Sequence, residues 1–228
     1  MNKLLRFERP HPAEVDEAYH ALNIGNIANV LYWKGFFEIV RNVPGAIVEC
    51  GVGRGRSLLI CAALNEIFAP EQGGRRAVFG YDSFEGFPQP SREDDSPRQP
   101  HQGEWARSPS GLYTYSPDFI ACVLANGGIE TQPTLGKGFF CSSLKSYPGD
   151  PIAILHVDCD LYQSYLDTLQ ALWDMIVVGG VVVFDDFLFQ SESNEDWPGA
   201  RRAVSEFFAD KNQTMHESIR GTPYIIKA

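Results

Sequence analysis

Hydrophobic and polar positions change their spacing repeatedly along the chain. Short, nearly continuous apolar runs are each followed by a stretch in which apolar residues return every three or four positions. The first pattern is typical of a buried strand and the second of an amphipathic helix. Strands that alternate with helices predict a mostly parallel sheet with helices on both faces.

The predicted elements cover most of the chain. Apolar positions between Ile24 and Val40 predict helices in an N-terminal extension, residues 1–44. Gly179-Gly180 is expected to end a helix, and the last residues predict an antiparallel hairpin. The strands are predicted at 46–52, 77–84, 133–138, 152–160, 180–187, 214–220 and 223–228, and the other helices at 56–68, 117–126, 163–176 and 198–210. These ranges predict one α/β domain, residues 1–228, with a seven-stranded sheet.

Residues 88–118 depart from this alternation. They contain six of the fifteen prolines, with Ser, Asp, Arg and Gly between them. A structureless loop of this length is unusual inside a compact domain and is usually functional or disordered. We therefore expect a mobile lid, and an ordinary disordered insertion is the alternative.

Composition narrows the possible partners. A chain of 228 residues with 44% hydrophobic residues can form one full core. The net charge of −10 disfavours nucleic acid and an anionic membrane surface. No signal peptide or apolar run of membrane-spanning length is seen, and the five cysteines have no CxxC spacing. We expect a cytoplasmic protein with reduced cysteines.

A glycine-rich turn follows the first predicted strand. Gly51, Gly53 and Gly55 would let the backbone approach a ligand closely, although a tight turn without a ligand would also need glycine. Asp82, at the end of the second strand, can accept both hydroxyls of a ribose and would repel a 2′-phosphate. Together they predict a site for an unphosphorylated nucleoside such as adenosine, and NAD would also fit. A helix cap is the alternative for Asp82.

Four aspartates follow two later strands. Asp158 and Asp160 are two positions apart at the end of a strand, which would place both side chains on the same face or rim, and Asp185 and Asp186 end the next strand. Gathered at one sheet edge, these carboxylates would repel one another unless a divalent cation such as Mg²⁺ binds them. Helix caps are the alternative. His156 is either a ligand, a base or a core residue.

Taken together, these motifs resemble the macrocin O-methyltransferase family, which methylates sugar hydroxyls of natural products. The matching segments are VECGVGRGRS (48–57), YDSFEGFP (81–88), GKGFFCSSL (136–144), DCDLYQS (158–164) and GGVVVFDDF (179–187). They occur in the family's order over about residues 45–210. The chain departs from the family pattern at Val52, at His156-Val157, and at Cys159, where a glycine is usual.

The resemblance implies a Rossmann-like class I methyltransferase fold, S-adenosylmethionine as methyl donor and Mg²⁺ as metal. It further implies a small hydroxylated acceptor, expected to be a sugar, and a homo-oligomer. The donor-binding positions that it implies are Glu49, Gly51, Gly53, Ser57, Asp82 and Ser83. The metal ligands that it implies are Asp158, Asp185 and Asp186, with Asp160 as general base.

Three other functions share some of these features. A catechol-type O-methyltransferase would use the same donor and metal for a flat phenol, and Trp105, Tyr113, Tyr115 or Trp197 would line its pocket. An NAD-dependent oxidoreductase is disfavoured because GxGxxG is absent and the acidic cluster has no role in it. A non-catalytic binding protein of the same fold would bind the donor without methylating any acceptor.

Overall fold

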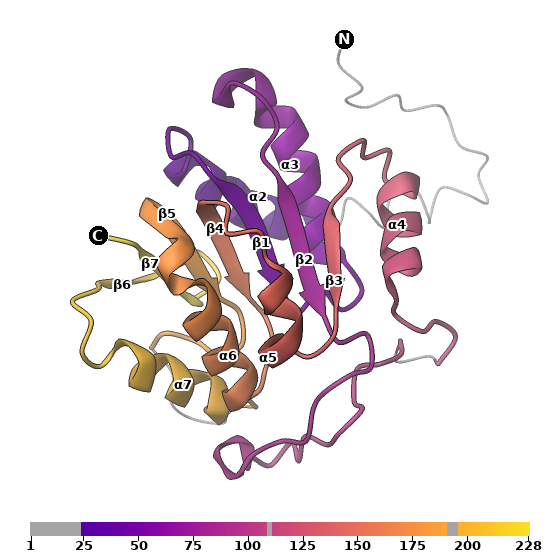
Figure 1. Ribbon diagram of the computed structural model, residues 1–228, viewed down its shortest axis with the longest axis vertical. Coiled ribbons are helices and arrows are strands. Elements are labelled where there is room, and N and C mark those ends of the chain that lie inside the picture. The colour runs from indigo at the N-terminus through magenta and orange to yellow at the C-terminus, as the bar shows by residue number, and fades with distance from the viewer. Residues whose placement is uncertain (1–23, 109–110, 191–195) are drawn as a thin grey trace.

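The computed structural model describes residues 24–108, 111–190 and 196–228, which form one seven-stranded sheet (Figure 1). The sheet order is β3-β2-β1-β4-β5-β7-β6. The strands are β1 (Ala46–Cys50), β2 (Val78–Asp82), β3 (Thr134–Lys137), β4 (Ile152–Val157), β5 (Ile176–Phe184), β6 (Met215–Glu217) and β7 (Pro223–Ile226). Strands β1 to β5 are parallel, and β7 runs antiparallel to both β5 and β6. The predicted fold class, with its C-terminal hairpin, is confirmed.

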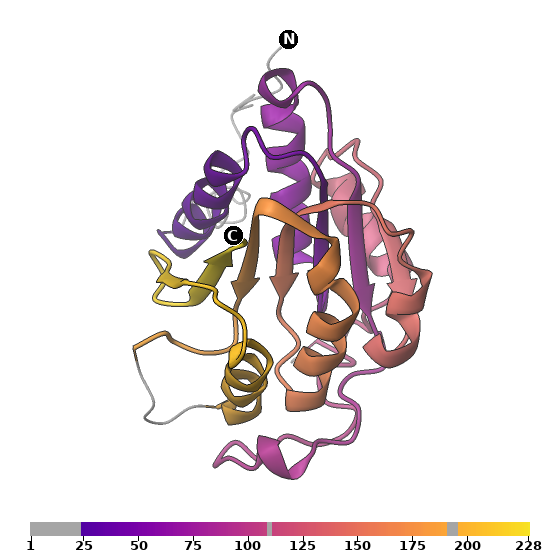
Figure 2. The same cartoon turned by 60° about the vertical axis from the view of Figure 1, so that its left-hand side comes forward.

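Helices cover both faces of the sheet (Figures 1 and 2). Helices α2, α3 and α4 lie against one face, and α5, α6 and α7 lie against the other. Their bounds are α2 (Ile24–Ile39), α3 (Arg56–Gln72), α4 (Pro117–Asn126), α5 (Phe140–Ser143), α6 (Tyr162–Leu172) and α7 (Pro198–Phe208), and three 3₁₀ segments are η1 (Arg92–Asp94), η2 (Leu144–Ser146) and η3 (Trp173–Met175). Residues 1–23 of the predicted N-terminal extension lie outside the described residues.

The sheet separates two hydrophobic cores. On one face, Trp33 of α2 and Leu58 of α3 pack against Ile154 of β4. On the other, Tyr165 of α6 and Val204 of α7 pack in the cluster that also contains strand residues of β1, β4 and β5. Because the central parallel strands are buried on both sides, their sequences are almost wholly apolar, as the sequence predicted.

Two predicted boundaries near the acidic residues were wrong. Strand β4 ends at Val157 rather than at residue 160, so the following aspartates lie in a turn. Helix α6 ends at Leu172, and the two glycines expected to end it lie inside β5 instead. There they occupy an irregular stretch of pairing with β4, where Gly179 has a φ of +83° that favours glycine.

Part of the segment expected to be a lid is held by hydrogen bonds to the rest of the protein. Asp94 in η1 is buried, and its Oδ2 accepts hydrogen bonds from the backbone N and Oγ of Ser91. Its Oδ1 accepts the backbone N–H of Tyr162, the first residue of α6, at 2.7 Å. An isolated antiparallel β-bridge pairs the backbones of Arg107 and Thr114. The described part of residues 88–118 is therefore not structureless, and its movement as a lid stays a prediction.

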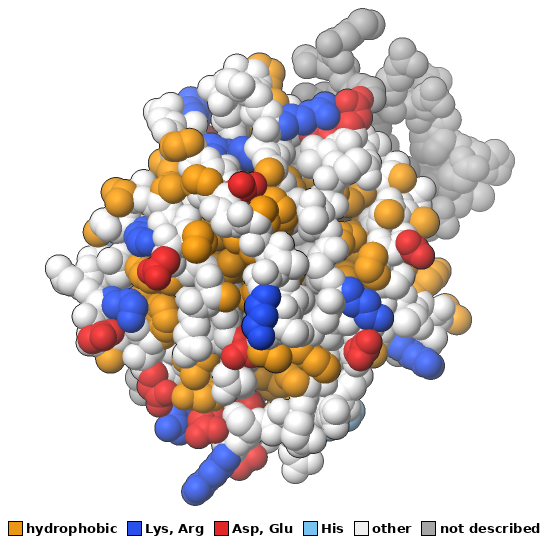
Figure 3. All heavy atoms as spheres, in the orientation of Figure 1, with side chains coloured by type: hydrophobic (Ala, Val, Ile, Leu, Met, Phe, Trp, Pro, Cys, Tyr) orange, Lys and Arg blue, Asp and Glu red, His pale blue; other side chains and the backbone are white. Residues whose placement is uncertain are grey.

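On the face drawn in Figure 3, the Lys and Arg side chains of the described residues are scattered among acidic and hydrophobic ones. No helix within the described ranges is long and apolar enough to cross a membrane.

Candidate functional site

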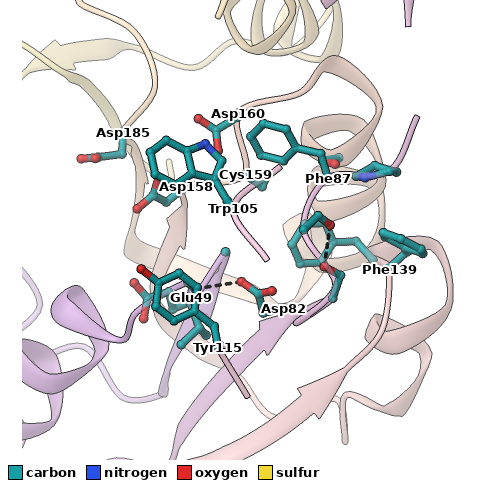
Figure 4. Close-up of a pocket in the computed structure, with 18 of the residues that line it drawn as sticks. Glu49, Asp82, Phe87, Trp105, Tyr115, Phe139, Asp158, Cys159, Asp160 and Asp185 are labelled. Atoms are coloured by element: carbon teal, nitrogen blue, oxygen red, sulfur yellow. Dashed lines mark hydrogen bonds between the residues drawn. The ribbon is translucent and has the colours of Figure 1, made fainter. Parts of the chain in front are cut away.

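A cavity of about 670 Å³ opens at the carboxyl ends of β1, β2, β4 and β5 (Figure 4). Its volume is in the range of small-molecule sites. The predicted site residues on its wall are Glu49, Gly51, Gly53, Ser57, Asp82, Ser83, Asp158, Asp160 and Asp185. Asp186, the remaining predicted residue, is not among the lining residues.

The glycine-rich turn brings two strand ends together. Gly51 has a φ of +98°, and a Cβ placed on it would lie 1.6 Å from the carbonyl oxygen of Asp158. The backbone N–H of Asp158 donates to the carbonyl of Cys50 at 2.9 Å. The chain can therefore pass from β1 into α3 next to residues 158–160, called the acidic turn below, only because residue 51 lacks a side chain.

Asp82 stabilises this turn. Its Oδ2 accepts the backbone N–H of Gly53 at 2.8 Å, and its Oδ1 accepts the backbone N–H of Phe84. Burial raises the pKa of Asp82, and these N–H groups act in the opposite direction. No helix lies in residues 83–91, so the helix-cap alternative for Asp82 is wrong. Each carboxylate oxygen has a second lone pair that a ribose hydroxyl can use.

Glu49, on the cavity wall, forms a hydrogen bond with His156, which does not line the cavity. Both are buried, and His156 Nδ1 lies 3.0 Å from Glu49 Oε1. Burial raises the pKa of Glu49. Burial alone would lower the pKa of His156, but its hydrogen bond to Glu49 and the charges of Glu49, Asp185 and Asp186 together raise it. The pair therefore holds a proton more firmly than either group in water. Glu49 Oε2 and His156 Nε2 have no hydrogen-bond partner among the described residues.

The acidic turn adjoins the Glu49–His156 pair through Asp158. Burial, followed by the charges of Asp185 and Asp186, raises the pKa of Asp158 well above its usual range. Potential ligand atoms of Glu49, His156 and Asp158 lie within 4.8 Å of one another. This group can hold a metal ion, and it shares only Asp158 with the predicted ligand set.

Asp186 stabilises the acidic turn by accepting hydrogen bonds from its backbone. Its Oδ2 accepts the backbone N–H groups of Cys159 and Asp160, at 3.1 and 2.8 Å, and the hydroxyl of Tyr165 at 2.7 Å. Burial, with the nearby charge of Asp185, raises its pKa to about 6. Asp160 itself has a φ of +61°, so hydrogen bonds to Asp186 hold a backbone conformation that is unfavourable for aspartate.

Several residues on the cavity wall were not predicted as site residues. Arg220, from the turn between β6 and β7, donates to Asp185 Oδ1 at 3.1 Å, and no local sequence signal marks this contact. Trp105 and Tyr115 line the cavity, as the catechol-type alternative expected, whereas Tyr113 and Trp197 do not. Away from the cavity wall, the Ser-x-x-Asp pattern at 91–94 is a local capping signal from which the 3₁₀ segment η1 could have been predicted.

The chain is similar to methyltransferases of natural-product pathways. A family model described as "Macrocin-O-methyltransferase (TylF)" matches residues 36–219. The chain is 30% identical over 171 residues to demethyldecarbamoylnovobiocin O-methyltransferase of Streptomyces niveus, covering 75% of this chain and 61% of the relative. It is 28% identical over 149 residues to 8-demethyl-8-(2,3-dimethoxy-alpha-L-rhamnosyl)-tetracenomycin-C 4′-O-methyltransferase of Streptomyces olivaceus, covering 64% and 54%. The chain thus spans less than two thirds of the length of these relatives.

A solved structure extends the match over almost the whole chain. The structure of CalS11, a calicheamicin methyltransferase, aligns with a TM-score of 0.77 and 25% identity. The alignment covers 96% of this chain and 87% of CalS11. The cavity described above therefore lies in a fold that solved methyltransferases also have.

Proposed function

The chain belongs to the macrocin O-methyltransferase family, and we propose that it transfers a methyl group from S-adenosylmethionine to a hydroxyl of a sugar on a natural product. The observation that carries the proposal is one cavity lined by both the glycine-rich turn and the acidic turn. A two-substrate transfer needs such an arrangement, because bringing the reacting groups together in the right orientation is a large part of its barrier.

The donor side of the cavity is formed by the ends of β1 and β2. Asp82 is the predicted acceptor for the ribose hydroxyls, and Gly51 and Gly53 let the backbone lie against the donor. Ser57 and Ser83 lie on the same wall, and Glu49 presents a buried carboxylate oxygen that lacks a partner. That oxygen is suited to an ammonium group, such as the one on the donor's amino acid portion.

The acidic turn fits a divalent cation. Its donors are carboxylate oxygens, which Mg²⁺ prefers, and burial together with their mutual repulsion raises the pKa of Asp158. We propose Asp158, Asp185 and Asp186 as the ligands, Asp186 through its Oδ1, because its Oδ2 accepts the hydrogen bonds of the acidic turn and of Tyr165. His156 and Glu49 adjoin Asp158. When bound, a divalent cation makes a hydroxyl more acidic and orients it.

Asp160 is the proposed general base. It lines the cavity one residue beyond Cys159, on the turn that Asp186 fixes. When bound, the donor supplies a sulfonium methyl group. An oxygen–carbon bond forms as the sulfur–carbon bond breaks, and Asp160 takes the proton of the acceptor hydroxyl. Positioned general bases contribute roughly 10²- to 10⁴-fold to such steps.

The acceptor class follows from relatives and is tested directly. One relative is named for an acceptor with a rhamnosyl group. We propose p-nitrophenyl pyranosides, including the α-L-rhamnoside, as a panel against catechols, with transfer followed from labelled donor. Transfer to pyranosides is the expected result. Transfer to catechols alone would favour the catechol-type alternative, and donor binding without any transfer would favour a non-catalytic protein.

A separate variant tests the assignment of Asp160 as the general base. Asp160→Asn is expected to lower turnover by about 10²- to 10⁴-fold while donor affinity stays unchanged. Asp174→Asn, an exposed aspartate in η3, is the control and should behave as the parent protein. Undiminished turnover in Asp160→Asn would reject the assignment. Homo-oligomerisation, which the family resemblance predicted, is tested separately by light scattering.

A further inference from the structure

An indole ring stands on the acceptor side of the cavity. Trp105 lies in the long connection between β2 and α4, yet it lines the cavity with Asp158 and Asp160 (Figure 4). Its side chain is 48% exposed. Burial in a core therefore does not explain why the ring occupies this place.

The backbone of Trp105 is held in a costly conformation. Its φ is +67°, in the left-handed region that large side chains rarely adopt. In the described part of the chain, positive φ values outside glycine occur only at Phe84, Gln99, Trp105 and Asp160. Strain of this kind persists where surrounding contacts hold it, and it gathers at binding and active sites. Trp105 and the proposed base share both this property and the cavity.

Arg98 supplies contacts that hold the ring. Its guanidinium carbon lies 4.0 Å from the ring centre of Trp197, just before α7, and 5.7 Å from that of Trp105. Both of its terminal nitrogens also bind the carboxylate of Glu104. The planar guanidinium thus connects the residue next to Trp105 with the start of α7.

Backbone hydrogen bonds also join two distant parts of the β2–α4 connection, residue 87 and residues 103–104, next to Trp105 in the chain. Phe87 and the 103–104 turn exchange backbone hydrogen bonds of 2.9 and 3.0 Å. A Cβ on Gly86 would lie 2.3 Å from the carbonyl oxygen of Glu104, so this close pairing requires glycine. The position of Trp105 is therefore fixed from two directions.

We propose that Trp105 is the platform against which the apolar face of the acceptor's sugar ring stacks, and that Arg98 positions this platform. The inference rests on the proposed function. The axial C–H groups of a pyranose carry a small positive charge, which suits the negative face of an indole. The hydroxyls at the ring's edge can then reach the carboxylates of Asp158 and Asp160, which lie on the same cavity.

The first test removes the platform. Trp105→Ala is expected to raise the KM for p-nitrophenyl α-L-rhamnopyranoside, or for whichever pyranoside of the panel is methylated, by about 10-fold or more. The KM for S-adenosylmethionine should not change. Trp105→Phe keeps a ring and should show a smaller effect, whereas Trp105→Leu keeps apolar volume without a ring and should resemble alanine. Tyr113→Ala, an exposed aromatic of the same loop that does not line the cavity, is the control.

The second test asks whether Arg98 acts through Trp105. Arg98→Lys keeps the charge but loses the flat, forked guanidinium, so the acceptor KM should rise while the donor KM stays constant. In the double variant with Trp105→Ala, the lysine should add nothing further. Fully additive effects would overturn the positioning role.

The outcomes separate this inference from the proposed function. If the parent protein methylates a pyranoside and both Trp105→Ala and Trp105→Leu keep its acceptor KM, the platform is refuted while the proposed function stands. If no pyranoside of the panel is methylated, the proposed function fails and this inference fails with it. Retained affinity for S-adenosylhomocysteine and an unchanged Tm show which variants are folded.

Discussion

The proposed donor half of the cavity, around Gly51, Gly53 and Asp82, and the proposed acceptor half, around Trp105 and the acidic turn, are built in opposite ways. On the donor half, backbone groups dominate. Each oxygen of Asp82 is satisfied by a backbone N–H, and Glu49 is the acid there that keeps one oxygen without a partner among the described residues. On the acceptor half, side chains dominate. Carboxylates there face one another, and burial with mutual repulsion raises the pKa of Asp158 and of Asp160 well above the usual range.

This difference indicates what each half still lacks. A turn whose polar groups are already paired is complete before its ligand arrives, which suits a donor that stays the same in every reaction. A cluster of carboxylates that repel one another is stabilised by a cation, and an exposed indole is stabilised by contact with an apolar ring. The acceptor half is thus completed by what it binds.

The largest expected effect comes from the residue at which the two halves meet. Gly51→Ala would place a Cβ 1.6 Å from the carbonyl oxygen of Asp158, and both atoms belong to main-chain segments that cannot rotate away. We expect a loss of more than about 3 kcal/mol in the free energy of unfolding, measured by urea denaturation, or no folded protein.

Gly53→Ala is the matched control for this change. Gly53 also has a positive φ, of +50°, but a Cβ there meets nothing within 4 Å. Only the cost of the left-handed conformation remains, about 1–2 kcal/mol. Equal losses in the two variants would mean that the approach of β1 to the acidic turn is not what makes Gly51 necessary.

Removal of divalent cations should affect the acceptor half alone. In excess chelator, we expect turnover to fall by about 100-fold or more and to return with added Mg²⁺, because the acceptor hydroxyl is no longer activated or oriented. Affinity for S-adenosylhomocysteine, measured by calorimetry, should stay unchanged. Full turnover in chelator would remove the metal from the proposed function and leave the carboxylate cluster without its expected partner.

The complementary change is made at Asp82. An amide at this position must turn its NH₂ group toward either Gly53 N–H or Phe84 N–H, since both carboxylate oxygens accept hydrogen bonds. The amide also leaves a ribose hydroxyl without a charged acceptor, at a cost of about 1–3 kcal/mol, so Asp82→Asn should weaken donor binding by roughly 10- to 100-fold. Glu85→Gln, at an exposed neighbour, is the control. Weaker donor binding in both variants would place the effect outside the Asp82 contacts.

The fold was easier to predict from the sequence than the acceptor half. Apolar spacing gave the order and type of the elements, because burial on both faces of a parallel sheet leaves few alternatives, and the family resemblance was confirmed. Asp158 and Asp160 share one rim as predicted, since both line the cavity, but the period-two reason for it was wrong. That spacing rule holds only within a strand, and β4 ends at Val157. The positive φ of Asp160 depends on contacts from the end of β5, which no local pattern reports.

The role of Asp186 was the least predictable. The sequence marked it as a ligand equal to Asp185, but the structure gives the two neighbours different surroundings. Asp185 lines the cavity and binds Arg220, while Asp186 accepts three hydrogen bonds from the turn and from Tyr165. Such roles are set by residues distant in the chain. Sequence spacing alone therefore identifies an acidic cluster without separating its members.

The smallest expected effect tests this supporting role. Tyr165→Phe removes the buried hydroxyl that donates to Asp186 at 2.7 Å and lies 3.1 Å from the carbonyl oxygen of Val157. We expect the free energy of unfolding to fall by about 1–2 kcal/mol, with unchanged donor affinity. Tyr147→Phe, whose hydroxyl donates to the backbone of Asp150 near the surface, should cost less than about 0.5 kcal/mol. Equal losses would mean that Asp186 holds the acidic turn without Tyr165, and the acceptor half would then depend on fewer side-chain contacts than its geometry suggests.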